Sequence, residues 1–294
     1  MQTLREVIEQ TQQRGVAIGH FNISDLILLK AVVAAARELD VAVIVGASQG
    51  ERDFMGVHEI AALVKSLREE SGVPIFLNAD HTHSLAKAEE AARAGFDAIV
   101  FDLSALPIEE NVRQTKEAVA ALKAIHPGIL IEGEIGDIGT GSEIHDAAPQ
   151  GLRLTTPQEA KEFAASTGID ILAPAVGNSH GLSRSMVRGE AEKRLDTGRI
   201  AEIAQATGLW LTLHGASGTN DADLAKAIQA GITEIHINTE LRLAWRRGLE
   251  SAFAKDPDQV VPYKLLPAAV EAMKQVVSAR LRLFNRRQSA AIAG

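Results

Sequence analysis

An acid and two histidines stand close together in the sequence NADHTHS, residues 78–84. This segment continues the apolar run VPIFL, so Asp80, His81 and His83 lie where a buried strand would end. Imidazole and carboxylate groups can bind a divalent metal ion together, and they can also transfer protons. A single histidine at such a place is more often a capping or core residue, so the positions of the other histidines decide between these roles.

Two further histidines follow later apolar runs in the same way. His180 stands in GNSHG after ILAPAVG, and His214 stands at the end of LWLTLH. Three neutral imidazoles that leave one position open make a catalytic zinc site, where the metal acts as a Lewis acid on a carbonyl. Because His81, His180 and His214 occupy matched positions, we predict that they bind one metal ion. Capping, core, supporting or surface roles are expected for His20, His58, His83, His126 and His145.

The strands that would carry these residues are eight short apolar runs, each followed by a stretch with helical spacing. They cover residues 16–23, 41–48, 73–80, 98–104, 129–136, 171–177, 209–217 and 234–238. Continuous apolar runs are typical of strands buried on both faces, as in a parallel sheet. The pattern predicts an α/β fold, a (β/α)8 TIM barrel with an N-terminal helix and a C-terminal helical extension.

Capping residues support these boundaries. TPQE offers Thr156 as a helix cap, with Pro157 and Glu159 in a capping box. Left-handed glycine caps are expected at Gly95, Gly168, Gly208 and Gly231. We interpret residues 1–294 as one barrel domain whose last residues, about 287–294, form a disordered tail.

An open doubly wound sheet would also alternate strands and helices, but it usually has a glycine-rich turn after its first strand. The corresponding segment here is HFNISD, so the barrel is favoured. The longest irregular segment, about residues 137–155, is rich in glycine and typical of a functional or mobile loop.

The active site of such a barrel lies at the carboxyl ends of its strands. Besides the three histidines, these ends carry Asn22, Ser48, Asp80, Asp102, Glu132, Glu134, His236 and Asn238. The loops after the seventh and eighth strands form the usual phosphate site of the fold, because helix N-termini stand behind them. The residues predicted to bind phosphate there are Gly181, Arg184, Gly215, Ser217, Asn238 and Thr239.

Composition limits the classes of protein that this chain can represent. Hydrophobic residues make up 46% of the chain and charged residues 23%, which is a globular profile. The net charge of −8 argues against nucleic acid or an anionic membrane as partner. The absence of cysteine excludes disulfides, iron–sulfur clusters and a cysteine nucleophile. With no signal peptide or apolar run that could span a bilayer, a cytoplasmic protein is expected.

Together, the motifs resemble those of the class II, metal-dependent fructose-bisphosphate aldolase family, which includes the tagatose-bisphosphate aldolases. The matching segments, in family order, are HFNISD, NADHTHS, FDLSALPIEEN, IEGEIG, GNSHG, LHGASG and VPYKLLPAAVEAMKQVVSARLRLF. The resemblance implies a divergent aldolase that reversibly cleaves a phosphorylated ketose, such as fructose 1,6-bisphosphate. The products would be dihydroxyacetone phosphate and an aldehyde, formed through a zinc-stabilised enediolate. It also implies a homodimer or homotetramer.

The resemblance further implies catalytic roles. His81, His180 and His214 would bind the catalytic zinc ion. Asp80 would be the acid/base that moves the proton of the hydroxyl at the bond being cleaved. Glu143, in the long loop, would shuttle the proton on the dihydroxyacetone phosphate carbon.

Binding roles follow from the same resemblance. Glu134 and Asp102 would hold an alternative or second divalent ion, and a monovalent cation, Na⁺ or K⁺, would lie near the phosphate. Arg280, in SARLRLF, matches an arginine that in some members binds the second phosphate of the substrate in the active site of the neighbouring subunit. Asn22, Ser48 and His236 are predicted to contact substrate.

The chain also departs from the family pattern. His236 replaces an asparagine that normally contacts the substrate hydroxyls, and the loop at 137–146 lacks the usual acidic run. Two other functions therefore stay open at this stage. One is a phosphosugar epimerase or isomerase that uses the same metal site without breaking a carbon–carbon bond. The other is a barrel that binds metal and phosphate without catalysis.

Overall fold

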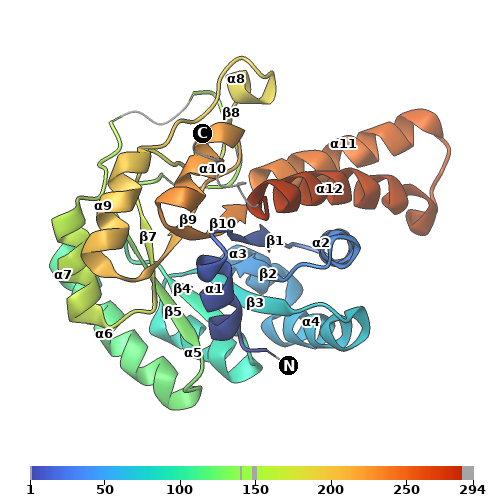
Figure 1. Ribbon diagram of the computed structural model, residues 1–294. Coiled ribbons are helices and arrows are strands. Elements are labelled where there is room, and N and C mark those ends of the chain that lie inside the picture. Colours follow the sequence, from blue (N-terminus) through green and yellow to red (C-terminus); the bar gives the residue numbers. More distant parts are fainter. Residues whose placement is uncertain (1, 140, 148–150, 287–294) are drawn as a thin grey trace.

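The eight predicted strands close into a parallel barrel (Figure 1). The computed structural model describes residues 2–139, 141–147 and 151–286, so the predicted tail at 287–294 lies outside the described residues. The barrel strands are β1 (Ile18–Asn22), β2 (Val43–Ser48), β3 (Ile75–Thr82), β4 (Ala98–Phe101), β5 (Leu130–Ile135), β7 (Ile171–Pro174), β9 (Trp210–Leu213) and β10 (Ile232–Ile237). Their order around the barrel is β1-β10-β9-β7-β5-β4-β3-β2, which confirms the TIM barrel.

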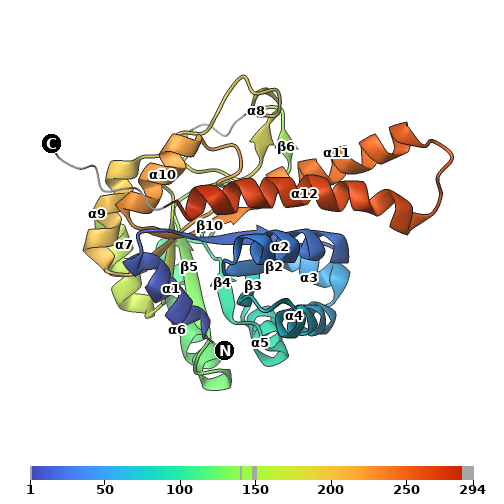
Figure 2. The same cartoon turned by 45° about the vertical axis from the view of Figure 1, so that its right-hand side comes forward.

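Helices pack around this barrel and across its amino end (Figures 1 and 2). They are α1 (Leu4–Gln13), α2 (Leu26–Leu39), α3 (Gln49–Met55), α4 (Val57–Ser71), α5 (Leu85–Ala94), α6 (Ile108–Ile125), α7 (Pro157–Thr167), α8 (Arg184–Val187), α9 (Thr197–Thr207), α10 (Asp221–Ala230), α11 (Thr239–Lys255) and α12 (Pro262–Phe284). The N-terminal helix and the C-terminal helical extension are thus confirmed. A small parallel sheet of β6 (Ile144–His145) and β8 (Leu182–Ser183) was not predicted; it joins the long loop to the segment after His180.

The predicted caps are present, with one difference. Thr156 and Glu159 form the capping box of α7. Gly95, Gly168 and Gly208 end their helices in the left-handed conformation. Gly231 also ends a helix, but its φ of 121° lies outside the left-handed helical region, so that prediction was wrong in geometry.

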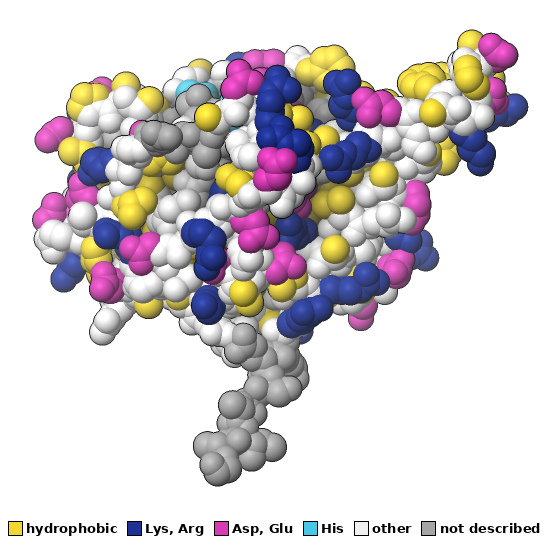
Figure 3. Space-filling view, turned by 90° about the horizontal axis from the view of Figure 1, so that it is seen from above, with side chains coloured by type: hydrophobic (Ala, Val, Ile, Leu, Met, Phe, Trp, Pro, Cys, Tyr) yellow, Lys and Arg dark blue, Asp and Glu magenta, His cyan; other side chains and the backbone are white. Residues whose placement is uncertain are grey.

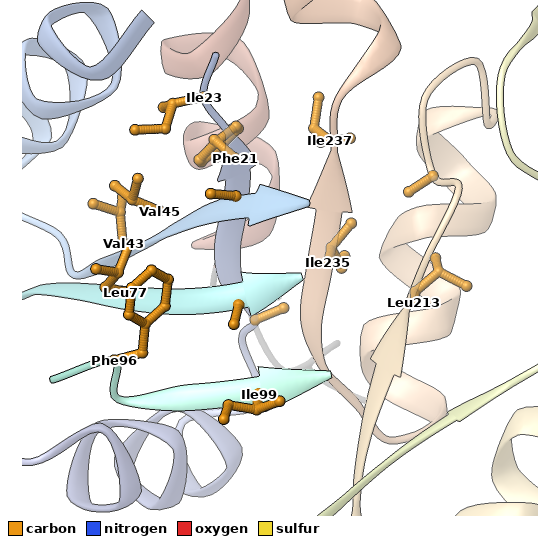
Figure 4. Close-up of a cluster of buried hydrophobic side chains, with 14 of the residues drawn as sticks. Phe21, Ile23, Val43, Val45, Leu77, Phe96, Ile99, Leu213, Ile235 and Ile237 are labelled. Carbon is orange, nitrogen blue, oxygen red and sulfur yellow. The ribbon is translucent and has the colours of Figure 1, made fainter. Parts of the chain in front are cut away.

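Each barrel strand turns alternate side chains outward and inward, because strand side chains have a period of two. The outward side chains form the large apolar layer between barrel and helices, to which Val43, Val45 and Leu77 belong (Figure 4). The residues between them, such as Ile44 and Phe76, belong to a separate inner cluster. The outer layer therefore holds the fold together, and the inner positions are free to differ from one end of the barrel to the other.

The amino end of the barrel is closed by apolar packing. Helix α1 turns Leu4, Val7 and Ile8 inward, where they meet inner residues of the strands. The inner residues of this cluster are Ile18, Ile44, Phe76, Ala98, Leu130 and Ile171. A capping box between Thr3 and Glu6 starts the helix at this place.

Helices α11 and α12 run side by side and project beyond the barrel as an arm (Figures 1 and 2). The end of this arm exposes large hydrophobic side chains: Phe253 is 49% exposed, Val260 84% and Tyr263 76%. Figure 3 shows hydrophobic side chains at the end of the arm, and basic and acidic side chains interspersed over the face that it depicts. None of the helices in the described part of the chain has the length and apolar character needed to cross a membrane.

Candidate metal centre and active site

Side chains from distant parts of the chain meet at the carboxyl end of the barrel. His81 lies on β3 and Glu134 on β5, while His180 and His214 follow β7 and β9. The four side chains whose ligand atoms all lie within 4.8 Å of one another are His81, Glu134, His180 and His214. The structure therefore brings the three predicted histidines and one predicted carboxylate into one cluster.

His81 is oriented for metal binding. Its Nδ1 lies 2.9 Å from Asp102 Oδ2, which leaves Nε2 directed into the cluster, 3.1 Å from Nδ1 of His214. Tetrahedral zinc with ligands at about 2.1 Å would hold neighbouring ligand atoms about 3.4 Å apart, close to this spacing. His81 also has a φ of 38°, a left-handed conformation that is strained for a histidine. A carboxylate on the far ring nitrogen is the usual support of a metal-bound histidine.

The side chain of Arg52 also fixes the backbone around His81. The guanidinium of Arg52 is buried and donates to the carbonyl oxygens of Ala47 and Asp80 and to Thr82 Oγ1. Because these acceptors lie at the ends of β2 and β3, Arg52 holds the two strand ends together. It thereby supports the strained residue between Asp80 and Thr82.

Two of the four clustered side chains are already in the protonation state that binds a metal ion. Burial, with the nearby charge of His81, lowers the pKa of His180 to about 3, and burial with the charge of His236 also lowers the pKa of His214. Both rings are therefore neutral and able to bind metal. Burial raises the pKa of Glu134 to about 8, so this carboxyl would lose a proton on binding metal. His81 differs: burial opposes its charge, but Asp80 and Asp102 raise its pKa to about 10, so metal binding there would release a proton.

Several buried atoms in and beside this cluster have no hydrogen-bond partner in the part of the chain that the structure describes. They are His180 Nε2, Glu134 Oε2 and Asp80 Oδ1. A buried polar atom without a partner costs roughly 1–3 kcal/mol, so its persistence calls for a ligand. A divalent ion would satisfy the first two, and the donor set of three imidazoles and one carboxylate fits zinc. The residues present therefore fit the metal.

Asp80 is held beside this cluster as a carboxylate. Its Oδ2 accepts a hydrogen bond from Asn22 Nδ2 at 2.8 Å, and its Oδ1 lies 3.5 Å from His236 Nδ1. Burial alone would raise the pKa of Asp80, but His81 and His236 hold it well below its usual range. An ionised carboxylate with one unpartnered oxygen next to a metal site is equipped to accept a proton.

His236 is buried inside the barrel, where its ring stacks on the ring of His20. Its ring lies 3.4 Å from that of His20, centroid to centroid, and its Nε2 lies 2.8 Å from Glu234 Oε1. Although burial opposes it, the nearby carboxylates of Asp80 and Glu234 raise the pKa of His236 to about 10. Oε1 of Glu132, one inward position below Glu134 on β5, lies 2.6 Å from His214 Nε2. The polar interior thus continues below the predicted metal ligands.

Two adjoining cavities open over this centre and share Asp80, His81, Ser142, His180 and Asn238. The predicted substrate and phosphate residues that line the first cavity are Asn22, Gly181, Gly215, Ser217, His236, Asn238 and Thr239. The predicted residues that line the second are Ser48, Asp102, Glu134 and Glu143, and His83 joins them. The structure thus gathers most of the predicted site residues around the two openings.

Three predicted residues lie differently from the rest. Asp102 binds the far nitrogen of His81 and Ser104 and is not one of the four clustered ligands. Arg184 is exposed and pairs with Asp146 away from the lining of both cavities. Arg280 also lies outside that lining and pairs with Glu240 and Asp221 of its own chain.

Some residues of the site were not predicted. Arg242 lines the second cavity, donates to Ser142 O at 3.0 Å and pairs with Glu51 at 2.7 Å. Its spacing of four residues from Asn238 on a helix could have indicated it. Lys193, which binds backbone carbonyls between the histidine loops, stands in an irregular segment whose sequence gives no signal.

The comparisons with known proteins agree with this geometry. The family model described as fructose-bisphosphate aldolase class-II matches residues 2–289. The chain is 35% identical over 286 residues to a probable fructose-bisphosphate aldolase of Bacillus subtilis, covering 96% of this chain and 97% of that protein. It is 34% identical to a fructose-bisphosphate aldolase of Staphylococcus aureus, covering 96% of each.

Solved structures extend the comparison to the fold. The YdjI aldolase of Escherichia coli K12 superposes with a TM-score of 0.81 at 30% identity, over 97% of both chains. A putative fructose-1,6-bisphosphate aldolase of Coccidioides immitis gives the same TM-score of 0.81 at 27% identity, over 97% of this chain and 96% of that one. With the family model matching almost its whole length, the chain belongs to the class II fructose-bisphosphate aldolase family of carbon–carbon lyases.

Proposed function

We propose that this protein is a zinc-dependent aldolase that reversibly cleaves a phosphorylated ketose to dihydroxyacetone phosphate and an aldehyde. One observation carries the proposal: the ligand atoms of three histidines and Glu134 cluster within 4.8 Å of one another, next to the carboxylate of Asp80. His81, His180 and His214 would hold the zinc ion. When bound, zinc supplies a Lewis acid for the substrate carbonyl and so stabilises the negative charge that develops on cleavage.

Asp80 would accept the proton of the hydroxyl at the bond being cleaved. Its Oδ1 has no hydrogen-bond partner among the described residues, whereas its Oδ2 is held by Asn22. One oxygen therefore positions the group and the other stays available for the reaction. Glu143 would move the proton on the triose phosphate carbon, since its exposed side chain is at the lining of the second cavity.

The phosphate of the triose half would bind where two loops and a helix end meet. Gly181, Gly215 and Ser217 line the first cavity next to the start of α11, which begins at Thr239. The Glu240 amide donates to Ser217 Oγ at 3.4 Å and the Leu241 amide to Asn238 O at 2.9 Å, and among the described residues the Thr239 amide has no such partner, so it is the amide of this helix end that an anion can reach. Asp102 and Glu134 would hold a second or alternative divalent ion beside the second cavity.

A cleavage assay tests this function. The zinc-loaded protein would be incubated with fructose and tagatose bisphosphates and with monophosphorylated ketoses, and released triose phosphate would be measured. We expect cleavage that a chelator abolishes and zinc restores, and no cleavage by Asp80→Ala with its zinc retained. Metal-independent cleavage that survives Asp80→Ala would contradict the proposal.

The same assay separates the other functions. Product analysis by NMR that finds only an isomerised or epimerised sugar would favour an epimerase or isomerase on this metal site. Zinc and phosphate binding without turnover of any ketose would favour a non-catalytic barrel.

We also infer that the chain forms a homodimer or homotetramer. The arm of α11 and α12 projects from the barrel and exposes Phe253, Val260 and Tyr263 at its end. Exposed apolar groups on a projecting element are typical of association sites. Light scattering should give a mass of two or four chains, and Phe253→Ser with Tyr263→Ser should lower it. A monomer at all concentrations would reject the inference.

A further inference from the structure

Lys193 places a buried charge among backbone carbonyls beside the predicted phosphate site. It stands between α8 and α9, and it is only 5% exposed. Its Nζ lies 2.5 Å from the carbonyl oxygen of Ser179, 2.6 Å from that of Gly181 and 2.9 Å from that of Gly215. An ammonium has three N–H donors, so each carbonyl accepts one of them.

The three carbonyls belong to the loops that carry the predicted metal ligands. Ser179 and Gly181 flank His180, and Gly215 follows His214. The two loops can approach because residue 215 is glycine: its φ is 59°, and a Cβ there would lie 2.3 Å from Ser179 O. The carbonyl dipoles of both loops therefore point their negative ends at one place, where a cation is stabilised.

The charge of Lys193 is not neutralised by a carboxylate. Within the described ranges, no carboxylate oxygen lies within 4.0 Å of its Nζ. Burial lowers the pKa of Lys193 to about 8, with Glu240 opposing the shift, so the side chain is still an ammonium at neutral pH. Gly181 and Gly215 also line the first cavity, so this positive charge lies behind the wall where the phosphate is expected.

The backbone of Lys193 is fixed to the same loop. Its N–H donates to Gly218 O at 2.9 Å, and its carbonyl accepts from Asn220 N–H at 3.3 Å. The segment also forms an isolated parallel bridge with Thr219. The ammonium is therefore held in place from both ends of the side chain.

We propose that the Lys193 ammonium is a built-in monovalent cation, which occupies the carbonyl site that a free Na⁺ or K⁺ would otherwise fill. It joins the His180 and His214 loops and supplies positive charge behind the phosphate site, as a positioning residue without direct contact with substrate. That the nearby anion is a substrate phosphate rests on the proposed function. That the Lys193 ammonium fills a cation site rests only on its contacts with the three carbonyl oxygens. The protein should therefore need no added monovalent ion.

The test removes the charge with a side chain that is one heavy atom shorter than lysine and ends before the place of Nζ. Lys193→Met would be compared with the wild type and with Lys123→Met, a control whose lysine pairs with Asp170 at the opposite end of the barrel. Each protein would be studied in choline, sodium, potassium and ammonium chloride at equal ionic strength. Thermal stability and the affinity for inorganic phosphate would be measured in every salt.

We expect the wild type and Lys123→Met to show the same melting temperature and phosphate affinity in all four salts. Lys193→Met should bind phosphate about tenfold or more weakly in choline, and potassium or ammonium should restore both its affinity and its melting temperature. A Lys193→Met protein that binds phosphate normally in choline, or that no cation improves, would overturn the proposal.

The test also gives an answer if Lys193→Met does not fold, or if the protein cleaves no ketose. If Lys193→Met does not fold, the wild type decides: unchanged phosphate affinity in choline supports the proposal, and a loss of about tenfold or more overturns it. Neither measurement requires carbon–carbon cleavage. Ion-specific rescue of Lys193→Met in a protein that cleaves no ketose would therefore reject the proposed function and leave the built-in cation standing.

Discussion

The two ends of the barrel interior are built from the same strands but from opposite kinds of side chain. On β1, the inward positions are Ile18, then His20, then Asn22, from the amino end to the carboxyl end. On β5 they are Leu130, Glu132 and Glu134. The amino end is a packed apolar cluster, whereas the carboxyl end carries buried polar groups.

The difference has an energetic meaning. Ile8 is fully buried among apolar neighbours, which stabilises the fold. At the other end, Asp80, Glu134 and His180 keep buried atoms that have no hydrogen-bond partner within the described ranges, which costs stability unless a ligand binds. Changes at the two ends should therefore separate stability from function.

The largest effect is expected from a metal ligand. His180→Ala should weaken zinc binding by more than about 100-fold, because supporting residues outside a ligand set are already worth about 10–100-fold. Competition titration with a chromophoric chelator measures this. His126→Ala, at the end of α6, is the control and should bind zinc as the wild type does. Equal zinc affinity in the two variants would remove His180 from the ligand set.

The next effect concerns catalysis with the metal in place. Asp80→Asn should lower kcat by about 10²–10⁴-fold, because an amide cannot accept the substrate proton. Its zinc content should stay unchanged. Asp170→Asn is the matched change at the amino end, where Asp170 pairs with Arg5 and Lys123. If Asp170→Asn lost as much kcat as Asp80→Asn, the assignment of function to one end would fail.

A stability effect should appear at the apolar end. Ile8→Ala removes a fully buried side chain from the inner cluster and should lower the free energy of unfolding by about 2–5 kcal/mol. Urea denaturation measures the change. The kcat of the folded variant should stay close to that of the wild type, and a large loss of kcat would show that the two ends are coupled.

The smallest effect is expected from a surface ion pair at the same end. Arg5 Nη2 lies 2.6 Å from Asp170, but the Arg5 side chain is 45% exposed. Solvent screening limits such a pair, so Arg5→Ala should change the free energy of unfolding by about 0.2–1 kcal/mol. Part of that change reflects lost packing on Trp210, over whose ring the guanidinium lies. A loss near that of Ile8→Ala would show that apolar packing does not dominate this end.

The fold was largely predictable because its signals are local. Buried parallel strands are continuous apolar runs, and the capping box at Thr156 is a pattern of four residues. The strands β6 and β8 were missed because two residues are too short to show any periodicity. The unusual φ of Gly231 could not be predicted. A glycine after a helical pattern shows that the helix ends there, but it does not fix the backbone angle of that glycine.

The site was predictable only in part, for a physical reason. Because the carboxyl ends of barrel strands meet at one rim, the sequence positions of His81, His180 and His214 were enough to predict that they cluster. Lys193 and Arg52 act through backbone carbonyls of residues far along the chain or in other elements, and no residue type marks such acceptors. The intrachain pairing of Arg280 was unforeseen because it depends on how α12 packs near Glu240.

The central claim is that His81, His180 and His214 bind one divalent ion beside Asp80. Zinc K-edge X-ray absorption of the zinc-loaded protein tests it directly. The claim predicts a first shell dominated by three imidazole nitrogens at about 2.0–2.1 Å, reduced by one imidazole in His180→Ala. A shell of oxygen ligands without imidazole scattering, or one unchanged in that variant, would contradict it.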